Sequence, residues 1–318
     1  MTDGVLITGG AGFIGSHICQ KLCASGREVV VLDNLATGSL DNLSGLDVRF
    51  VEGSVANFDD VEKAMSGIKK VVHLAALPSV ARSLEQPLET HEACATGTAN
   101  VLQAAHLGGA RVVYAGSSSA YGNHDAKQKH ELLREDPLSP YSAAKLSGEL
   151  YCRSFARVFD MDVVVTRFFN VFGPRQPADS PYSGVIAAFC RNLILGNPVR
   201  IDGDGGQGRD FTYVEDLVAG ILQCLDGAST GCNTVNLAYG ESRTVLDIYE
   251  LLCTFTRQQL PSQPIPDPMR LPPRVGDVRH SLADVTRAKE QFGFAPTVGF
   301  AEGLARTFAW YRTQLESE

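Results

Sequence analysis

Tyr141 and Lys145 stand four positions apart in the run SPYSAAK, residues 139–145. Ser139 suits the N-cap of a helix and Pro140 its first position, so the run predicts a helix start with both side chains on one face. A phenol has an ordinary pKa of about 10, which a neighbouring ammonium and a helix N-terminus both lower. The pair therefore predicts a tyrosine base that takes the proton of a hydroxyl group, although the same spacing is structural on many helices.

Three serines follow a predicted buried strand upstream of that helix, in the stretch from Gly116 to Gly122. A hydroxyl at this point could hydrogen-bond a reacting oxygen beside the tyrosine. Taken alone, a serine-rich stretch after a strand is a polar turn. The candidate residues are Ser117, Ser118 and Ser119.

A glycine-rich loop, residues 9–15 (GGAGFIG), joins the first predicted strand to a helix. Its glycines allow a tight turn, close approach of the backbone to a pyrophosphate and close packing of helix on strand. The helix N-terminus then offers free N–H groups to phosphate oxygens. The pattern predicts a dinucleotide site, with a structural turn as the alternative. The residues expected to line it are Gly9, Gly12, Phe13, Ile14 and Gly15.

Asp33 closes the second predicted strand about 20 residues after the loop, where an acid accepts hydrogen bonds from a ribose diol. A carboxylate there would repel the 2′-phosphate of NADP, and the following Asn34 and Leu35 supply no arginine to offset this repulsion. The sequence therefore predicts NAD as the cofactor, with Asp33 and Asn34 in contact with it. Its nicotinamide cation would be a third positive influence on Tyr141.

Short β-branched runs alternate with helical patterns through the first half of the chain. The runs are apolar along their length, as expected of strands covered on both faces, and repeated β–α units predict a doubly wound parallel sheet. The predicted strands are Val5–Thr8, Glu28–Leu32, Val48–Val51, Lys70–Leu74, Arg111–Ala115 and Asp162–Thr166. The predicted helices lie near 13–25, 57–67, 84–107 and 139–159.

After Arg167 the alternation ends, and isolated short strands are expected between helices near 183–195, 214–226, 244–257, 283–291 and 299–315. Loops rich in Gly and Pro are predicted at 173–182 and 203–209, and an ordered loop or linker at 261–274. The predicted fold class is α/β, a Rossmann-type doubly wound parallel sheet with a smaller C-terminal α/β substrate domain. We expect an NAD-binding domain of residues 1–172, to which 211–240 return, and a substrate domain of 173–210 and 241–318.

The composition is that of an ordinary globular protein, with 44% hydrophobic and 20% charged residues. A formal net charge of −8 argues against nucleic acid or an anionic membrane as the main partner. No signal peptide and no membrane span is expected. The eight cysteines form no metal-binding pattern, so we expect no metal site, reduced thiols and a cytoplasmic location.

Taken together, these motifs resemble the extended short-chain dehydrogenase/reductase family, in the branch of NAD-dependent epimerases and dehydratases that contains UDP-galactose and UDP-N-acetylglucosamine 4-epimerases. The resemblance covers nearly the whole chain. The matching segments are Thr8–Gly15, Asp33–Asn34, His73–Ala76, Ser117–Gly122, Tyr141–Lys145, Arg167–Arg175, Arg209–Asp216 and Arg274–Asp277.

The resemblance implies a catalytic triad of Ser117, Tyr141 and Lys145, in which Lys145 also holds the nicotinamide ribose. It implies further cofactor contacts from Leu74, Ala75 and Ala76. On the substrate side it implies a sugar contact from Asn170, diphosphate clamps from Arg209 and Arg274, and a uridine-ribose contact from Asp277. Each arginine could instead form a surface ion pair.

One position departs from the family pattern. The family usually has an acid after the third strand to hold the adenine amine, whereas Glu52 and Gly53 here lead into Ser54. A serine can accept a hydrogen bond but carries no charge.

The choice of reaction depends on what lies beside the tyrosine. Related dehydratases carry an Asp-Glu pair at the positions of Ser118 and Ser119, and related decarboxylases a Glu at Ser119. This chain has no carboxylate between Gly116 and Gly122, and a serine cannot replace a carboxylic acid in proton transfer at neutral pH. We therefore expect NAD-dependent 4-epimerization of a UDP-hexose through a transient 4-keto sugar.

Ser281 resembles the small residue that leaves room for an acetamido group in N-acetylhexosamine epimerases, although it could also be solvent-facing. This favours UDP-GlcNAc/UDP-GalNAc as substrates, with UDP-Glc/UDP-Gal accepted too. The alternatives are a UDP-glucuronate 4-epimerase or decarboxylase, and a non-catalytic NAD-binding sensor. By analogy with the family we expect a homodimer through the helices near 84–107 and 139–159.

Overall fold

A parallel sheet of seven strands forms the centre of the protein in the computed structural model, which describes residues 4–179, 183–273 and 278–316. The strand order is β11-β6-β5-β4-β1-β2-β3, and every pairing is parallel. The strands are β1 (Val5–Thr8), β2 (Val29–Asp33), β3 (Val48–Glu52), β4 (Lys70–His73), β5 (Arg111–Ser117), β6 (Val163–Phe168) and β11 (Cys232–Leu237). The six strands predicted in the first half are all present, with ends within two residues of the prediction, and the α/β fold class is confirmed.

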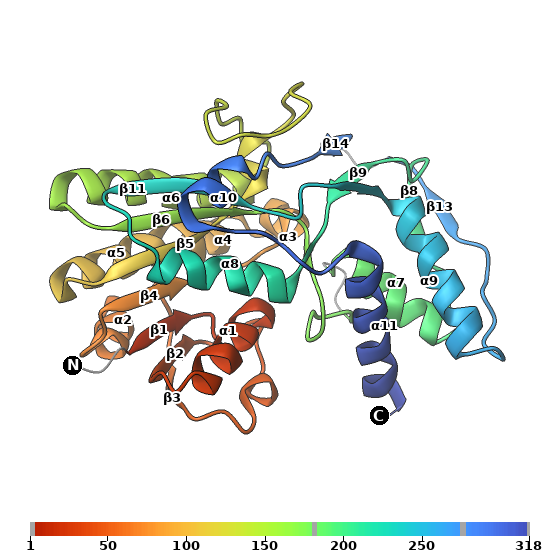
Figure 1. Ribbon diagram of the computed structural model, residues 1–318, viewed down its shortest axis with the longest axis horizontal. Coiled ribbons are helices and arrows are strands. Elements are labelled where there is room, and N and C mark those ends of the chain that lie inside the picture. Colours follow the sequence, from red (N-terminus) through yellow and green to blue (C-terminus); the bar gives the residue numbers. More distant parts are fainter. Residues whose placement is uncertain (1–3, 180–182, 274–277, 317–318) are drawn as a thin grey trace.

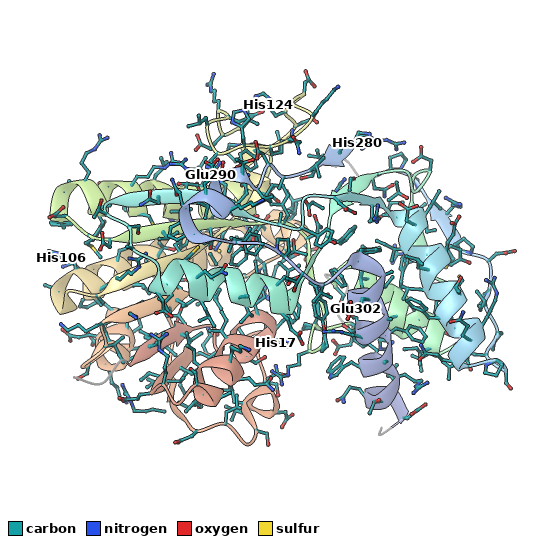
Figure 2. All side chains as sticks on the ribbon, viewed as in Figure 1. His17, His106, His124, His280, Glu290 and Glu302 are labelled. Carbon is teal, nitrogen blue, oxygen red and sulfur yellow. The ribbon has the colours of Figure 1, made fainter. Side chains whose placement is uncertain are left out.

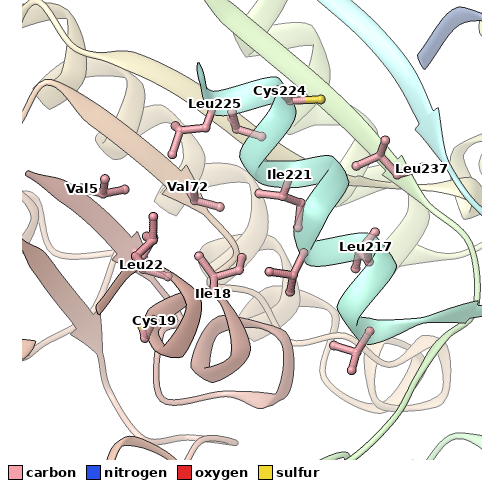
Figure 3. Close-up of a cluster of buried hydrophobic side chains, with 14 of the residues drawn as sticks. Val5, Ile18, Cys19, Leu22, Val72, Leu217, Ile221, Cys224, Leu225 and Leu237 are labelled. Atoms are coloured by element: carbon pink, nitrogen blue, oxygen red, sulfur yellow. The ribbon is translucent and has the colours of Figure 1, made fainter. Parts of the chain in front are cut away.

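Helices cover both faces of this sheet and bury its β-branched side chains (Figure 1). On one face α1 (Phe13–Ala24) and α8 (Val214–Asp226) pack together, and Figure 3 shows Ile18 of α1 and Ile221 of α8 pointing into the same cluster. On the other face lie α2 (Phe58–Met65), α5 (Gly97–Gly108) and α6 (Pro140–Phe159). Because β1 is flanked by β2 on one side and β4 on the other, the strand order reverses there, and a crevice for ligands is expected at the carboxyl ends of these strands.

The helix predicted near 84–107 is broken into several pieces. It comprises α3 (Val80–Glu85), α4 (Pro87–His91), a π-helical segment η2 (Glu92–Thr96) and α5. Pro87 begins α4 because proline cannot supply the N–H that would continue α3, and it disfavours a helical conformation for the residue before it. Helical periodicity alone could not place the π-helical segment, since its residues have ordinary helix propensities.

A second lobe holds a cluster of aromatic and aliphatic side chains between α7 (Val185–Ile194), α9 (Val245–Gln259) and α11 (Phe300–Glu316). Three small sheets accompany these helices. They pair β12 (Ser242–Thr244) with β9 (Gly208–Asp210) and β14 (His280–Ser281), β13 (Met269–Leu271) with β8 (Arg200–Asp202), and β10 (Thr212–Tyr213) with β7 (Val171–Phe172). Figure 1 labels β8, β9, β13 and β14 on the side of α9. The remaining short elements are η1 (Leu40–Leu43), η3 (Ser118–Tyr121) and α10 (Thr286–Phe292).

The structure differs from the sequence prediction in two loops of this lobe. The segment 261–274, predicted as a loop or linker, contains β13, and the predicted loop 203–209 runs into β9. Strands of two or three residues have no periodicity to detect, and they form here because partners distant in sequence pair with them. The division of the chain into two domains stays a prediction.

Among the described residues, no helix is both long and apolar enough to span a bilayer.

Candidate active site

The start of α6 is fixed by a reciprocal hydrogen-bonding pattern that places Tyr141 in its first turn. Ser139 Oγ accepts from the Ser142 backbone N–H at 3.1 Å, and Ser142 Oγ accepts from the Ser139 N–H at 2.9 Å. This capping box and Pro140 at the first position confirm the predicted helix start. Tyr141 and Lys145 therefore lie one turn apart on the same helix face.

Ser117 lies next to Tyr141 at the end of β5. The Ser117 hydroxyl accepts hydrogen bonds from the backbone N–H and the hydroxyl of Ser119, at 3.2 and 2.9 Å. Burial raises the pKa of the Tyr141 phenol above its ordinary value, the Cys94 thiol adds to this, and a hydrogen bond with Ser117 lowers it. The structure thus brings Ser117 and Tyr141 into direct contact.

Lys145 is buried, with 3% of its surface exposed, and its ammonium lies 4.6 Å from the centre of the Tyr114 ring. Burial lowers its pKa, while Cys94, Glu149 and Cys152 act to raise it. The ammonium of Lys145 is expected to lower the pKa of Tyr141. In this structure the hydrogen bond with Ser117 lowers that pKa, and Lys145 is not among the groups that shift it. Within the described residues the ammonium has a cation–π contact and no hydrogen bond, so its three donors remain available for a ligand with hydroxyl groups.

A chain of buried hydrogen bonds connects Thr8, at the end of β1, to η2 and α5. Thr98 Oγ1 donates to the Cys94 carbonyl at 2.5 Å, so it accepts from His73 Nε2–H at 3.0 Å. His73 Nδ1 then accepts from Thr8 Oγ1 at 2.7 Å, and Thr8 Oγ1 accepts from the Ala75 N–H at 3.2 Å. Burial lowers the pKa of His73 to about 3, with a further contribution from Lys145, so its imidazole is neutral. Sequence reasoning did not connect these residues, because Thr8 and Thr98 have no distinctive spacing.

The glycine loop is packed too tightly to carry side chains at several positions, among them Gly9 and Gly15. Gly9 has a φ of +73°, and a Cβ at Gly15 would lie 2.2 Å from the Gly9 carbonyl oxygen. Gly9 also packs against the backbone of Ala75, which follows β4 together with Leu74 and Ala76. Gly12 is the N-cap of α1 and provides no side-chain cap, so the first N–H groups of the helix have no side-chain acceptor there. Phe13 and Ile14 in this first turn are partly buried against the core.

The Asp33 side chain lies beside this loop. Its carboxylate accepts from the Ala11 N–H at 3.0 Å and from the Leu35 N–H at 2.8 Å. Burial raises its pKa, and these two hydrogen bonds lower it. Asn34 accepts from the Ala36 N–H at 3.1 Å and is directed into its own turn.

The residues present fit a dinucleotide such as NAD. A Cβ at Gly9 would collide with the backbone of Ala75, and one at Gly15 with the backbone of Gly9 and Gly10, so the loop needs glycine for the tight turn and close packing typical of a pyrophosphate-binding loop. Asp33 lies at the end of β2, where a ribose diol would reach it. The ammonium of Lys145 lacks the hydrogen-bond acceptors that a second ribose would supply.

A carboxylate does lie near the position where the family usually has an acid. Asp60 of α2 accepts from the Ser54 N–H at 3.0 Å, and a Cβ on Gly53 would meet this carboxylate at 2.8 Å. The sequence did not indicate Asp60, because it lies inside α2 and not directly after β3.

The substrate-side candidates form a second group. Ser281 of β14 is paired with Arg209 of β9, so these two residues are neighbours across a small sheet. Arg209 donates to the Gly208 carbonyl at 2.8 Å. Asn170 is exposed between β6 and β7. Arg274 and Asp277 lie outside the described residues. Ser118 and Ser119 lie in η3, at the carboxyl end of the central sheet.

Asp210 holds the segment that directly follows Ser281, a role that the sequence did not reveal. Its buried carboxylate accepts from the backbone N–H groups of Ala283 (3.2 Å), Tyr239 (3.0 Å) and Gly240 (3.0 Å). Burial raises the pKa of Asp210 to about 7, while these hydrogen bonds lower it. The position of Ser281 thus depends on a residue next to Arg209.

The two lobes also meet beside α1, whose His17 is labelled in Figure 2. His17 Nε2 donates to the Pro174 carbonyl at 2.9 Å, and the guanidinium of Arg175 donates to Gln20 Oε1 at 2.7 Å. Arg175 adopts a φ of +67°, a left-handed conformation that is strained for a residue with a side chain. The helix at the cofactor loop is therefore tied directly to the loop that leads into the second lobe.

Comparison with known proteins gives a consistent result. The profile of a family described as "NAD dependent epimerase/dehydratase family" matches residues 5–238. The chain is 34% identical over 317 residues to a UDP-glucose 4-epimerase of Mycolicibacterium smegmatis, covering 97% of this chain and 98% of that protein. It is 30% identical over 316 residues to a UDP-N-acetyl-alpha-D-glucosaminuronate decarboxylase of Bacillus cytotoxicus, with coverage of 96% and 97%.

Solved structures resemble the chain over the same extent. A UDP-glucose 4-epimerase of Thermotoga maritima with UDP-glucose superposes with a TM-score of 0.92 at 35% identity, covering 98% of this chain and 99% of that one. A UDP-N-acetylglucosamine 4-epimerase of Methanobrevibacter ruminantium in complex with UDP-N-acetylmuramic acid gives a TM-score of 0.90 at 34% identity, with coverage of 99% and 100%.

Proposed function

Because the chain belongs to the NAD dependent epimerase/dehydratase family, we propose that it catalyses the 4-epimerization of a UDP-hexose. Membership makes it an NAD-dependent enzyme, in agreement with the sequence prediction. The proposed substrates are UDP-GlcNAc/UDP-GalNAc, with UDP-Glc/UDP-Gal also accepted. The transient intermediate is a 4-keto sugar.

The observation that carries this proposal is that, among the described residues, no carboxylate acts on the Tyr141 phenol. Ser117 ends β5, and Ser118 and Ser119 follow it in η3. In the described part of the chain the pKa of Tyr141 is raised by burial and the Cys94 thiol and lowered by the hydrogen bond with Ser117. Removal of water or of a carboxylate needs a further proton donor or acceptor near the sugar. Epimerization needs only one acid–base group, which Tyr141 provides.

Each residue then has one role. Bound NAD supplies the hydride acceptor and donor at C4 and adds positive charge that lowers the pKa of the phenol. Tyr141 takes the proton of the 4-hydroxyl group and later returns it. Ser117 hydrogen-bonds the same oxygen and keeps it in line with the phenol. Lys145 directs its ammonium to the ribose hydroxyls of the cofactor and orients that part of the site.

Recognition of the nucleotide sugar is assigned to the second group of residues. We assign Arg209 and Arg274 to the diphosphate, because guanidinium groups pair well with phosphate oxygens. Asp277 is assigned to the uridine ribose and Asn170 to the sugar. The small side chain of Ser281 next to Arg209 supports room for an acetamido group, as does the likeness to the Methanobrevibacter enzyme.

The test is to incubate the purified protein separately with UDP-GlcNAc, UDP-Glc and UDP-GlcA, without added NAD, and to separate the products by chromatography. We expect UDP-GalNAc from UDP-GlcNAc and a slower formation of UDP-Gal from UDP-Glc. Release of carbon dioxide from UDP-GlcA, with no epimer from the other two sugars, would refute the proposal.

The second candidate is a decarboxylase or 4-epimerase of a UDP-uronate. The 30% identity to the Bacillus decarboxylase over nearly the full chain supports it. The serines at 117–119 count against decarboxylation, because a serine cannot replace the glutamate that related decarboxylases carry at position 119. A non-catalytic NAD sensor is a third possibility, against which the contact between Tyr141 and Ser117 counts, since a sensor has no use for a positioned phenol.

We also propose a homodimer in a reducing, cytoplasmic environment. All eight cysteines are free, which supports the compartment. Eight of the large apolar side chains that are exposed in the described residues gather on α3, α4, α5 and α6, which pack against one another. They are Val80, Leu84, Leu88, Leu107, Leu150, Tyr151, Val158 and Phe159. An apolar face of this extent is typical of an interface between subunits.

A further inference from the structure

A hollow of about 670 Å³ lies at the outer edge of the central sheet, away from the proposed active site. It is bounded by α6, α10, the edge strand β11 and the segment 131–135, and Figure 1 shows α6, α10 and β11 close together. Arg153 and Arg157 on α6 line it. They follow Tyr141 by 12 and 16 residues, so at 1.5 Å per residue they lie about 18 Å or more along the helix from the catalytic tyrosine.

Four arginines from three separate segments converge on this hollow, which we call the arginine hollow. They are Arg134, Arg153, Arg157 and Arg287. In the described part of the chain no carboxylate is paired with Arg134, Arg157 or Arg287. Cys232 lines the same hollow, and the charges of Arg153 and Arg287 both act to lower the pKa of its thiol. The two guanidinium groups therefore lie near the same point of the hollow.

The acidic residues of the hollow are already engaged. Glu135 accepts from Arg153 at 2.6 Å and from the buried Arg167 at 2.8 Å, and Glu131 accepts from the Asn236 N–H at 2.7 Å. The hydrogen bonds from Arg153 and Arg167 outweigh the effect of burial and lower the pKa of Glu135 to about 2, so this carboxylate stays ionised and bound. The remaining guanidinium groups leave a local excess of positive charge in a protein with a net charge of −8.

We propose that the arginine hollow binds a small molecule that carries a phosphate or diphosphate group, at a site separate from the one around Tyr141. Guanidinium groups form paired hydrogen bonds with phosphate oxygens, and Arg153 is held in place by Glu135 and Glu149, so it needs little reordering on binding. The volume is that of a site for a small molecule. The net negative charge of the chain does not favour a nucleic acid.

The test measures binding of inorganic pyrophosphate by calorimetry to the full-length Arg209→Gln/Arg274→Gln holoenzyme, whose nucleotide-sugar site has lost both diphosphate contacts assigned above. This protein is the parent chain for the variants below. We expect one site per chain that weakens as ionic strength rises. The double variant Arg157→Gln/Arg287→Gln should bind about a hundredfold more weakly, since each lost charge-assisted hydrogen bond costs about tenfold. Equal affinity in the double variant, or no binding by the parent chain, would overturn the proposal.

The matched control is Arg257→Gln, which removes an exposed arginine from the last turn of α9, as Arg157→Gln does on α6. Arg257→Gln should leave the affinity for pyrophosphate unchanged. If this variant also lost binding, the effect would come from the net charge of the protein, and the proposed site would be refuted. Circular dichroism verifies that all variants fold. Competition by AMP against pyrophosphate would identify a nucleotide as the source of the phosphate, whereas competition by inorganic phosphate alone would identify the free anion.

Discussion

The phenol of Tyr141 is buried beside Ser117, and burial opposes its ionisation. An unperturbed phenol would need its pKa lowered by about three units to reach neutrality, which corresponds to roughly 4 kcal/mol, and burial of Tyr141 adds to this demand. That is more than one neighbouring group normally supplies. Lys145, the N-terminus of α6 and the positive ring of bound NAD would have to act together. The phenol is therefore predicted to be an effective base only in the holoenzyme.

Replacement of Tyr141 by Phe removes the proton acceptor while keeping the ring. We expect kcat to fall by about 10²- to 10⁴-fold, the usual contribution of a general base, with little change in NAD affinity. Turnover is measured by product chromatography and NAD binding by fluorescence. Tyr151→Phe, on an exposed part of the same helix, is the control and should keep full activity. Undiminished turnover in Tyr141→Phe would show that another group is the base.

His73 links stability to pH. Its pKa is about 3 in the folded protein and about 6.5 in the unfolded chain, so between these values the unfolded state binds more protons. Its contribution is fully present above about pH 6.5 and is lost as pH falls toward 3, by at most about 1.4 kcal/mol per pH unit.

His73→Gln should reduce the free energy of unfolding at pH 7.5, because it disturbs the hydrogen bonds with Thr8 and Thr98. The free energy of unfolding should also fall less steeply between pH 7.5 and pH 4.5 than it does in the parent chain. Urea unfolding at several pH values measures both effects. If the variant declines as steeply as the parent chain, the pH dependence has a different origin.

At this scale the sequence predicted that Ser117, Tyr141 and Lys145 lie near one another, because their motifs are local and the order of strands brings them to one edge of the sheet; their catalytic roles stay a proposal. It did not predict Asp60 as a neighbour of Ser54, the role of Asp210, or the chain of hydrogen bonds through His73. These depend on contacts between residues far apart in the sequence, and their residue types are common in strands and helices.

At the scale of secondary-structure elements, the first turn of α6 determines where the side chains of Tyr141 and Lys145 lie. Ser139→Ala would remove the side-chain acceptor for the Ser142 N–H, at a cost of about 1 kcal/mol in the free energy of unfolding. Thermal or urea unfolding measures it. Ser147→Ala, in the middle of the same helix, is the control and should change stability by only a few tenths of a kcal/mol. Equal effects in both variants would mean that the capping box contributes nothing specific.

The strands of the central sheet were predictable because their buried, β-branched runs are bounded by turns. The helices were predicted less accurately where a proline or a π-helical segment interrupts them, as at Pro87 and Glu92–Thr96. The small sheets of the second lobe were not predictable, since two- and three-residue strands such as β13 and β14 exist only through their partners.

At the scale of the whole molecule, the exposed apolar face on α3 to α6 predicts the oligomeric state. Leu88 is 83% exposed, so an aspartate there would be tolerated by a monomer but would be buried in a dimer interface. Light scattering should find two chains per particle for the parent protein and one for Leu88→Asp. Leu40→Asp, on η1 beside α1, is the control and should remain dimeric. A monomeric parent protein would contradict the proposed interface.

The position of β11 has a consequence for synthesis of the chain. Its pairing partner β6 ends at Phe168, whereas β11 ends about 70 residues later at Leu237. At roughly 5–20 residues per second, the ribosome leaves the edge of β6 uncovered for about 4–14 seconds. An uncovered edge of this kind readily recruits strands of other chains. A protein truncated before β11 is thus expected to aggregate, and extending it through Leu237 should restore solubility.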